Sequence, residues 1–541
     1  MLIIALDNNT LIAELIKSST IDIRQLGAKN EISFDNKNYI QKGINNFKTI
    51  IISDNYYTSN AITLNSNISI YGSGKIYTNS PYIFSGNNIS NVTIKDIELE
   101  STVDTTDTAN MSETTPDTRG YTTLSSIIDI SNSNNITLNK LKVHGGFTGI
   151  FCHGCNNVTV ENCNCYESSS KIVCLSQSVY KLINNYIHDI SNNEEYYACY
   201  LFQSTDSDDI DTQELSIING NIFENNNVWD AIMMHKYNKI NIVNNTIKNV
   251  RNGLDLSLIS SNTMESGNII ISNNYIEGTT IDMWSGNSAL NHGIFVKGNE
   301  YQNNVVISNN IVKNFGKFTS PSGGSVIHIQ DTANVNINNN VIVYPETLNT
   351  IYGAIHLRSN LNNVNVENNV VESSTLTAVL LNDTTINNLN IISNIFNNTA
   401  SYSINSINGN TITNAHFKNI FNSTNEMIFR NTDVINGVTY TADINNPIFN
   451  TELRFLKSIE SFDLAPNSFV NKNISNSDVN YSGVFNIQGL YDVDPANANF
   501  PAGCIVRAKY GSSSIIQLTF YNMTSSSLTI PTTNYVIKYI K

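Results

Sequence analysis

The sequence has few of the residues that mark several common classes of protein. Only 14% of its 541 residues are charged, and 30 Lys and Arg stand against 45 Asp and Glu, which gives a formal net charge of -15. No basic run occurs, and a nucleic-acid partner would need clustered Lys and Arg for its phosphates. Proline is scarce, with 9 residues, while 40% of the chain is hydrophobic. This composition excludes a disordered chain and argues against binding to nucleic acid.

Long hydrophobic runs are also missing. No segment approaches the roughly 20 apolar residues of a membrane span, and the opening MLIIALDNN has no basic leader and too short an apolar stretch for a signal peptide. We therefore expect neither a membrane span nor a secretion signal.

Cysteine is uncommon, and five of the 7 Cys lie between Cys152 and Cys174. The spacings CHGC and CNC resemble metal-binding motifs, but they coincide with repeat positions at which Cys is a good small core residue. The odd count shows no regular pairing. We expect no metal, no other cofactor and no disulfide framework.

A six-residue pattern, apolar-x-Asn-Asn-x-apolar, returns through the middle of the chain. It reads IVNNTI, ISNNYI, ISNNIV, INNNVI and VENNVV, with the second Asn at Asn245, Asn274, Asn310, Asn340 and Asn369. Intervals of 29, 36, 30 and 29 residues are typical of a solenoid in which each repeat adds one coil. We expect these Asn side chains to stack as an internal amide ladder at a turn between strands, as part of the scaffold.

A second element accompanies the repeat, a small residue followed by apolar-x-apolar. Examples are GIFCH from Gly149, AIMMH from Ala231, GLDLS from Gly253, GIFVK from Gly293 and AIHLR from Ala354. The strand period of two sends Ile294 and Val296 inward and Phe295 between them outward. Three short strands per coil predict an all-β protein with a parallel β-helix over about 80–450.

The ends of the chain differ from this repeat. Residues 8–18 carry apolar residues on one helical stripe, which predicts a short amphipathic helix in an N-terminal peptide of residues 1–20. Residues 21–79, with a helix expected around 39–44, are interpreted as a cap on the first coil. Residues 451–541 contain short alternating strands separated by Ser, Asn and Gly, which predicts an antiparallel β-sandwich.

The order of these parts resembles the bacteriophage tailspike and capsular polysaccharide depolymerases of the pectate-lyase-like right-handed β-helix class. IDIRQLGAKNEISFDNKNYIQKGI resembles the entry motif of that class, although Leu26 replaces its usual Phe and the Asp-rich loop is reduced to Asp35. FKTIIISDNYYTSNAITLNSNISIYGSG resembles its cap strands. PAGCIVRAK, IIQLTFYNMTSSSLTI and YVIKYIK resemble the small β-sandwich that ends several phage fibres and spikes.

This resemblance implies a right-handed parallel β-helix and a homotrimer. It also implies a place on the virion, with the N-terminus attached to a phage tail or baseplate protein. The partner that it implies is a bacterial surface polysaccharide, capsular or O-antigen, which the protein binds and cleaves.

Because coils stack about 4.8 Å apart, aligned strands place outward residues in columns. The first predicted column runs through Phe151, Cys174, Tyr200, Met233, Asp255, Phe295, His328, His356 and Leu380. The second column, two residues further on, runs through His153, Ser176, Phe202, His235, Ser257, Lys297, Gln330, Arg358 and Asn382. Ionisable and aromatic side chains concentrate on this face between 195 and 360, which favours a glycan groove over an ordinary solvated sheet face.

Hydrolysis of a glycan requires two carboxyl groups, about 5 Å apart for retention or roughly 6.5–9.5 Å apart for inversion. Asp230 and Asp255 lie on adjacent coils and fit either range, and Glu195 is a third candidate. Asp230 and the triplet Asn291-His292-Gly293 resemble motifs of the polygalacturonase branch of the class, whose Asp-Asp position reads Arg251-Asn252 here and whose Arg-Ile-Lys motif is missing. We predict catalytic roles for Asp230, Asp255, Glu195 and His292.

Other polar and aromatic side chains of the same face are predicted to bind substrate: Trp229, His235, Arg251, Lys297, His328, Gln330, Tyr352, His356 and Arg358. Two alternatives to hydrolysis stay open. A polysaccharide lyase would need a base and a stabilising cation to remove the proton α to a uronate carboxyl group. The residues that could supply them are His292, Lys297, His328, Tyr352, His356 and Arg358. A non-enzymatic adhesin would bind the glycan without cleaving it. Acids of the loop 206–211 would join a site formed between protomers.

Overall fold

The structure is a computed structural model that describes residues 2–7, 10–15, 20–103, 126–169, 171–176, 179–190, 197–202, 215–225, 230–235, 239–257, 268–279, 291–298, 304–315, 324–343, 353–372, 377–397, 402–421, 426–430, 432–436, 438–439, 444–445, 452–459, 461–475, 491–495, 504–512, 515–530 and 533–540. The chain divides into two compact units, Met1–Ala333 and Asn334–Lys541, and each is described by itself.

The chain opens with a β-hairpin. Strands β1 (Leu2–Asp7) and β2 (Thr10–Leu15) pair antiparallel, with Leu2 opposite Leu15 and Asp7 opposite Thr10. The amphipathic helix predicted over 8–18 is therefore wrong. The preceding run LIIALD supplies a partner strand, whereas an isolated helix of this length is marginal in water.

The next segment forms the start of the β-helix. The 3-10 helix η1 (Ile23–Leu26) is capped by Asp22, whose side chain accepts a hydrogen bond from the Arg24 N–H group, and it ends at Gly27 with φ +102°. Helix α1 (Lys37–Asn46) lies where a helix was expected and buries Ile40 and Ile44. This apolar stripe faces the first coil, as a cap requires.

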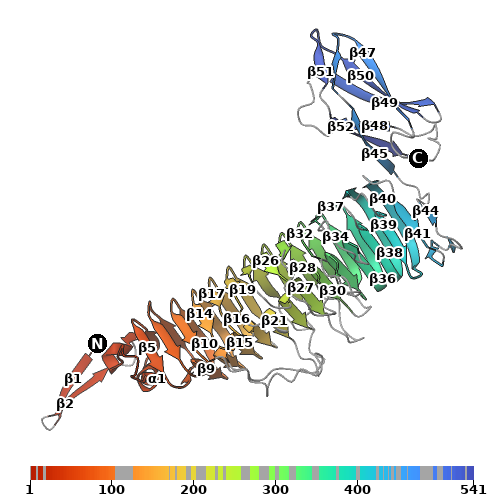
Figure 1. The fold of residues 1–541 in the computed structure, drawn as a ribbon. Coiled ribbons are helices and arrows are strands. Elements are labelled where there is room, and N and C mark those ends of the chain that lie inside the picture. The colour runs from red at the N-terminus through yellow and green to blue at the C-terminus, as the bar shows by residue number, and fades with distance from the viewer. Residues whose placement is uncertain are drawn as a thin grey trace. The chain divides into compact units, whose positions relative to one another are not determined.

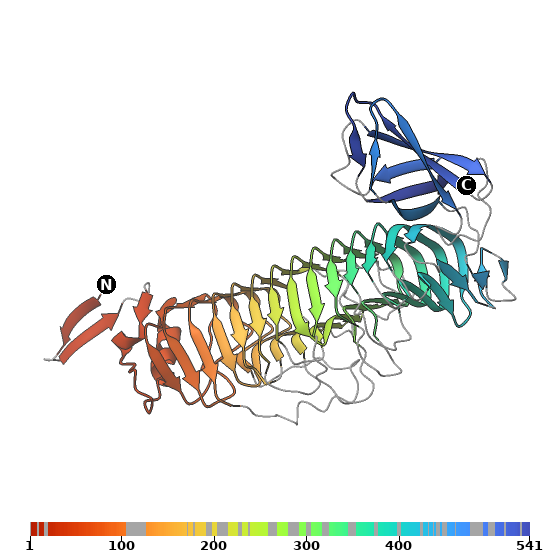
Figure 2. The same ribbon diagram turned by 45° about the horizontal axis from the view of Figure 1, so that its top comes forward.

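Three parallel sheets run through the first unit, and Figure 1 and Figure 2 show their strands stacked in sequence order. Sheet I consists of β6 (Ile62–Thr63), β9 (Phe84–Asn87), β12 (Ser126–Ser131), β15 (Thr148–His153), β18 (Lys171–Ser176), β21 (Tyr197–Phe202), β24 (Asp230–His235), β27 (Asn252–Ser257), β30 (Ile294–Lys297) and β33 (Ile327–Gln330). Sheet II consists of β3 (Thr20–Asp22), β4 (Thr49–Ile51), β7 (Ile68–Tyr71), β10 (Ser90–Lys95), β13 (Asn134–Asn139), β16 (Asn156–Glu161), β19 (Tyr180–Ile183), β22 (Ser216–Asn219), β25 (Lys239–Val243), β28 (Asn268–Ser272) and β31 (Asn304–Ser308). Sheet III consists of β5 (Asn55–Thr58), β8 (Lys75–Thr78), β11 (Glu98–Ser101), β14 (Lys142–Gly145), β17 (Asn164–Tyr166), β20 (Tyr186–His188), β23 (Ile222–Glu224), β26 (Thr246–Val250), β29 (Tyr275–Gly278) and β32 (Ile311–Lys313). The predicted all-β class and parallel β-helix are confirmed.

Like residues stack from coil to coil inside this helix. In sheet II, Ile218 pairs with Ile242, Ile242 with Ile271, and Ile271 with Ile307, and all four side chains are fully buried. Burying one such side chain contributes about 1.5–3 kcal/mol. Close packing explains the small residue near the start of the sheet I strands. A Cβ atom on Gly253 would collide with the backbone oxygen of Gly293.

The Asn-Asn turn between sheets II and III forms the predicted amide ladder. In the first unit, the residue before each ladder Asn takes a left-handed backbone, as at Asn244 with φ +57° and at Gly220 with φ +69°. Gly and Asn tolerate this backbone better than most residues. The second Asn is buried, and in each step its Nδ2 and backbone N–H donate to Oδ1 of the next Asn at 2.9–3.0 Å. In the first unit the ladder consists of Asn185, Asn221, Asn245, Asn274 and Asn310.

The second unit repeats this architecture and then changes it. Its first part consists of β34 (Ala333–Asn338), β35 (Val341–Val343), β36 (Ile355–Glu367), β37 (Val370–Glu372), β38 (Val379–Asn397), β39 (Ile404–Ile407), β40 (Thr411–Phe421), β41 (Met427–Phe429), β42 (Val434–Ile435), β43 (Val438–Thr439) and β44 (Ile444–Asn445). The pairs β36–β38 and β38–β40 are parallel, and the amide ladder runs through Asn340, Asn369, Asn394 and Asn419. The last pairs, β41–β44 and β42–β43, are antiparallel.

The C-terminal strands are antiparallel, as predicted for a β-sandwich. They are β45 (Glu452–Ile459), β46 (Phe462–Leu464), β47 (Phe469–Ser475), β48 (Tyr491–Pro495), β49 (Cys504–Ser512), β50 (Ile515–Asn522), β51 (Leu528–Ile530) and β52 (Thr533–Ile540). They form the sheets β45-β52-β48, β47-β50-β49 and β46-β51. The Phe462 ring packs edge-on against Phe520 at 5.0 Å between centroids, and Leu518 and Ile530 are buried beside it.

Candidate functional site

Sheet I places the predicted columns in register within the first unit. The first column runs, pair by pair, through Phe151, Cys174, Tyr200, Met233, Asp255, Phe295 and His328. The second column runs through His153, Ser176, Phe202, His235, Ser257, Lys297 and Gln330. In the second unit, His356 pairs with Leu380 and Arg358 with Asn382. The alignment by small residues therefore gives the correct register on both sides of the division.

Asp255 is a carboxyl group of the first column. The residue is partly exposed, but its Oδ1 is buried and has no hydrogen-bond partner among the residues that the structure describes. Burial raises the pKa of Asp255 well above its usual range, the charge of Asp230 raises it further, and Lys297 partly opposes both effects. The environment of Asp255 thus favours its protonated form.

Asp230 has a different environment. It begins β24 opposite Asn252, and it shares the inward parity of Ile232 and Met234, so it is almost fully buried. Burial raises the pKa of Asp230 to about 7, although the hydrogen bond from Asn252 and the positive charge of Arg251 lower it. The environment therefore favours the ionised form of Asp230 more than that of Asp255.

His292 continues the row that begins with Asp230 and Asn252. Its backbone N–H donates to Asn252 Oδ1 at 3.0 Å, and its ring Nδ1 accepts from the backbone N–H of Ser325 at 3.1 Å. Burial lowers the pKa of His292 to about 4, so the neutral ring is favoured near pH 7. We call Asp230, Asn252, His292 and Ser325 the corner ladder, because they stack where the chain enters sheet I.

Three rings form an aromatic cluster next to Asp255 on the C-terminal side. The ring centroids lie 5.2 Å apart for His292 and Phe295, 5.0 Å apart for His292 and His328, and 4.8 Å apart for Phe295 and His328. His328 is buried. Phe295 is the partly exposed ring of this cluster, and an apolar side chain beside an acid is the usual composition of a small-molecule site.

The remaining predicted site residues fall into three groups. Lys297 and Arg358 are exposed, and Gln330 donates to Asp331 Oδ2 at 3.0 Å. His356 is buried in the second unit, with its Nε2 3.3 Å from Asn382 Nδ2, which indicates a role in packing. Outside the described residues lie Glu195, Trp229, Tyr352 and the loop 206–211, and of His235 only the backbone in β24 is described.

Sequence reasoning missed one carboxyl group of the first column. Thr63 pairs with Ser85, Ser85 with Asp129, and Asp129 with Phe151, so the column extends toward the N-terminus. The signal is the segment SIIDIS, in which Asp129 stands at the outward position between Ile128 and Ile130. It has no Gly or Ala before the strand, so the small-residue rule did not find it.

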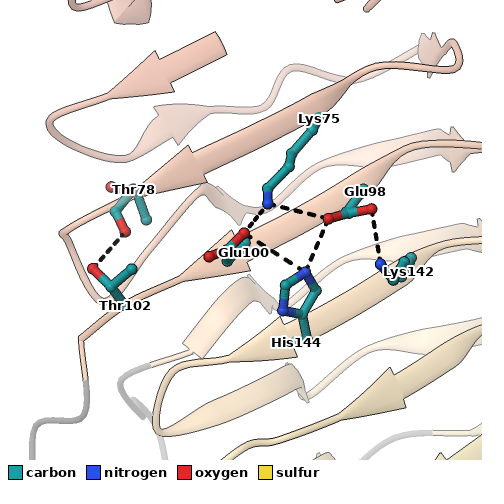
Figure 3. A network of polar contacts seen from close by, with 7 residues as sticks. All are labelled: Lys75, Thr78, Glu98, Glu100, Thr102, Lys142 and His144. Carbon is teal, nitrogen blue, oxygen red and sulfur yellow. Dashed lines mark hydrogen bonds and ion pairs between the residues drawn. The ribbon is translucent and has the colours of Figure 1, made fainter. Parts of the chain in front are cut away.

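A charged cluster on sheet III was also not predicted. Figure 3 shows Glu98, Glu100 and His144, whose ligand atoms lie within 4.8 Å of one another, in the arrangement of a possible metal site. Lys75 contacts both acids, and Lys142 Nζ lies 3.1 Å from Glu98. Burial acts to raise the pKa of Glu98, but hydrogen bonds from His144, Lys142 and Lys75 lower it to about 2. The cluster is therefore a salt-bridge network in which lysines already neutralise the acids.

Comparison with solved structures finds tailspike proteins and a glucanase among the similar chains. The tailspike of E. coli bacteriophage HK620 in complex with a pentasaccharide, as an E372Q mutant with a two-residue deletion, is 12% identical, with 96% of this chain and 94% of that chain covered and a TM-score of 0.47. The catalytic unit of a GH87 α-1,3-glucanase from Streptomyces thermodiastaticus is 13% identical, with 73% and 68% covered and a TM-score of 0.46.

No family model matches the chain, and no curated protein sequence matches it. In the part of the chain that the structure describes, no helix is long and apolar enough to cross a membrane.

Proposed function

We propose that the chain is a phage tailspike depolymerase that binds a bacterial surface polysaccharide, capsular or O-antigen, along sheet I and hydrolyses it. The observation that carries this proposal is Asp255, an outward acid with one shielded oxygen and a raised pKa. Breaking a glycosidic bond requires a group that still holds its proton near neutral pH and gives it to the leaving oxygen.

Asp230 is the second carboxyl group in this proposal. It lies one coil before Asp255 and three residues nearer the start of the strand, so ideal strand spacing separates the two Cα atoms by about 11 Å. That separation, with the two side chains on opposite faces of the sheet, is wider than the carboxyl spacing of about 5 Å in a retaining enzyme. Asp230 Oδ1 is buried on the inner side of the sheet and receives no hydrogen bond from a described residue, so in this proposal Asp230 acts on Asp255 through its charge.

The other residues of the face have supporting roles. Lys297 and Gln330, side by side in the second column, are placed to contact sugar hydroxyl groups. The aromatic cluster of His292, Phe295 and His328 supports the apolar face of a sugar ring. Asn252, through a hydrogen bond, and Arg251, through its positive charge, stabilise the ionised form of Asp230.

A panel of capsular and O-antigen polysaccharides incubated with the full chain tests the proposal. Hydrolysis yields saturated new reducing ends, and inversion appears in the anomeric configuration of the first product by NMR. Elimination at a uronate would instead yield an unsaturated sugar that absorbs in the ultraviolet, and a binding-only adhesin would leave the chain length unchanged. Either of these last results contradicts the hydrolase.

We also propose that the chain is a homotrimer on the virion tail. Three exposed apolar residues of sheet III support self-association: Tyr186 pairs with Ile222, and Ile311 follows in the same column, each 36–42% exposed. Rows of exposed apolar side chains are typical of protein interfaces. Sedimentation analysis tests this, because Ile222→Lys is expected to weaken the trimer and Ile222→Val is not.

The N-terminal hairpin is proposed as the attachment to a phage tail or baseplate protein. A two-stranded hairpin is at best marginally stable in water, so a partner surface would stabilise it. Deleting residues 1–15 should leave polysaccharide cleavage intact and abolish incorporation into virions.

A further inference from the structure

A hollow of about 410 Å³ opens on sheet I among β6, β9, β12 and β15. Its lining includes Thr63, Ser85, Asn87, Asp129, Ser131 and His153. This volume falls within the roughly 300–1,000 Å³ of small-molecule sites in proteins. The residues belong to the same two columns as the candidate site, because Asn87 pairs with Ser131 and Ser131 with His153.

The hollow is separate from the Asp255 region. Asp129 and Asp255 stand in one column, and the strands β15, β18, β21 and β24 lie between their strands. Five steps of about 4.8 Å place them roughly 24 Å apart. No single sugar ring spans that distance, so a ligand unit in the hollow does not touch Asp255.

The chemistry of the lining indicates what the hollow takes. Its described lining contains hydroxyl and amide groups, one carboxyl group and one imidazole, and neither Lys nor Arg. Burial alone raises the pKa of Asp129 to about 6, and burial lowers the pKa of His153. Both groups are therefore held toward their uncharged forms, in which each can donate and accept hydrogen bonds. An anionic ligand would find no fixed positive charge here.

We propose that this hollow is a second carbohydrate site, which binds a neutral, hydroxyl-rich sugar unit and takes no part in bond cleavage. Only the class of ligand, a carbohydrate, is taken from the proposed function. Thr63, Ser85 and Ser131 offer hydroxyl groups from three adjacent strands, and Asn87 offers an amide. The aromatic ring of Phe151 is buried next to Asp129 in the first column and packs against His153, with 6.3 Å between the ring centroids.

Ligand-observed saturation-transfer NMR on the full chain tests this site. The probes are D-glucose, D-galactose, L-rhamnose, N-acetyl-D-glucosamine and D-glucuronate. We expect at least one neutral sugar to bind, and glucuronate to bind more weakly at neutral pH. Ser85→Phe and Ser131→Phe each fill the hollow and should weaken binding by about tenfold or more.

Matched variants exclude trivial causes. Thr137→Phe adds the same ring at a partly exposed position of β13 in sheet II and should leave binding unchanged. Asp129→Asn keeps the shape and the neutral hydrogen-bonding character, so it should retain binding. The proposal is overturned if the signal is the same in both filled variants, if glucuronate binds best, if Asp129→Asn abolishes binding, or if no neutral sugar binds.

The same measurement separates this site from the proposed reaction. Asp255→Asn should remove cleavage and leave the binding that depends on Ser85 intact. If no polysaccharide is cleaved by the wild-type chain, the proposed function fails, and the result at the hollow still stands by itself.

Discussion

The two polar ladders inside the first unit differ in their residues and in how completely they are hydrogen-bonded. The amide ladder repeats one residue, and each of the steps from Asn185 to Asn310 makes the same two hydrogen bonds. The corner ladder changes residue at every step, and Asp230 Oδ1, His292 Nε2 and Ser325 Oγ are buried there without a hydrogen-bond partner among the described residues. Buried polar groups are normally paired, so unpaired ones call for a reason. Uniform, satisfied polar groups indicate scaffold, whereas varied, unsatisfied ones next to Asp255 indicate function.

The largest effect is expected from breaking the amide ladder. Asn245→Ala removes the acceptor for the backbone N–H and the Nδ2 of Asn221, which lie 2.9 and 3.0 Å from Asn245 Oδ1. An unsatisfied buried group costs about 1–3 kcal/mol, so we expect a loss of about 3 kcal/mol or more in the free energy of unfolding. Chemical denaturation measures it. The neighbouring Asn244→Gly, which suits the left-handed backbone, serves as control and should cost less than about 1 kcal/mol.

Removing the proton of Asp255 tests the functional side of the comparison. Asp255→Asn should lower kcat/KM for the cognate polysaccharide by about 10²–10⁴-fold, because the leaving oxygen loses its general acid. Reducing-end assays measure the rate, and the free energy of unfolding should not fall. Glu224→Gln, a carboxyl change on sheet III, should have no effect on rate. A fully active Asp255→Asn would rule out the acid assignment.

The corner ladder predicts a pH dependence of stability. The folded pKa of Asp230, about 7, lies above its unfolded value of about 3.9. The folded state therefore holds the extra proton, and the stabilisation is complete below about pH 4 and lost as the pH rises through 7. Asp230→Asn should thus match the wild type near pH 4 and exceed it by up to about 4 kcal/mol at pH 8.

His292 supplies the control with the opposite sign. Its folded pKa of about 4 lies below its unfolded value, so its contribution is complete above about pH 6.5 and lost as the pH falls toward 4. His292→Asn keeps an acceptor for the Ser325 N–H and should flatten this acidic limb only. If the free energy of unfolding of Asp230→Asn and of His292→Asn changed with pH as it does in the wild type, the corner ladder would be solvated and not buried.

The smallest effect concerns Lys297. Its charge lowers the pKa of Asp255, so Lys297→Met should raise that pKa and extend activity to higher pH. Because the side chain is exposed, we expect a shift of less than about one pH unit in the alkaline limb of kcat/KM. Added salt should shift the wild-type limb in the same direction and leave the variant unchanged. A shift toward lower pH would contradict the role of Asp255 as an acid.

Much of the fold could be predicted because the repeated residues show how the strands of successive coils align. The second Asn of each pair marks one corner and the small residue marks the start of sheet I, so Met233, Asp255 and Phe295 could be aligned without coordinates. The N-terminal hairpin was missed because Leu11, Ile12 and Leu15 satisfy a helical stripe and also suit a strand. Only the pairing with the LIIALD run decides between the two.

The candidate site was harder to predict than the register. Asp230 and Asp255 were expected to lie on one face, but the alternation along β24 and β27 gives them opposite parity, and Asp230 is buried. The packing of several coils decides which buried polar atoms lack a hydrogen-bond partner. The residue pattern of a single strand therefore cannot predict them. His356 is a second example. Its position in the sequence fits the first column, but its ring is buried next to the Asn382 amide.

The amide ladder also determines where this protein can change in length. Successive ladder residues are 36, 24, 29 and 36 positions apart from Asn185 to Asn310, although every step makes the same contact. The two-residue turn between sheets II and III is constant, so the extra residues all fall in the connections before and after the strands of sheet I. Differences in repeat length therefore fall between the ends of the sheet I strands and the strands of the other two sheets. In the proposed depolymerase, exchanging those connections would change the surroundings of sheet I while the stack that supports them keeps its spacing.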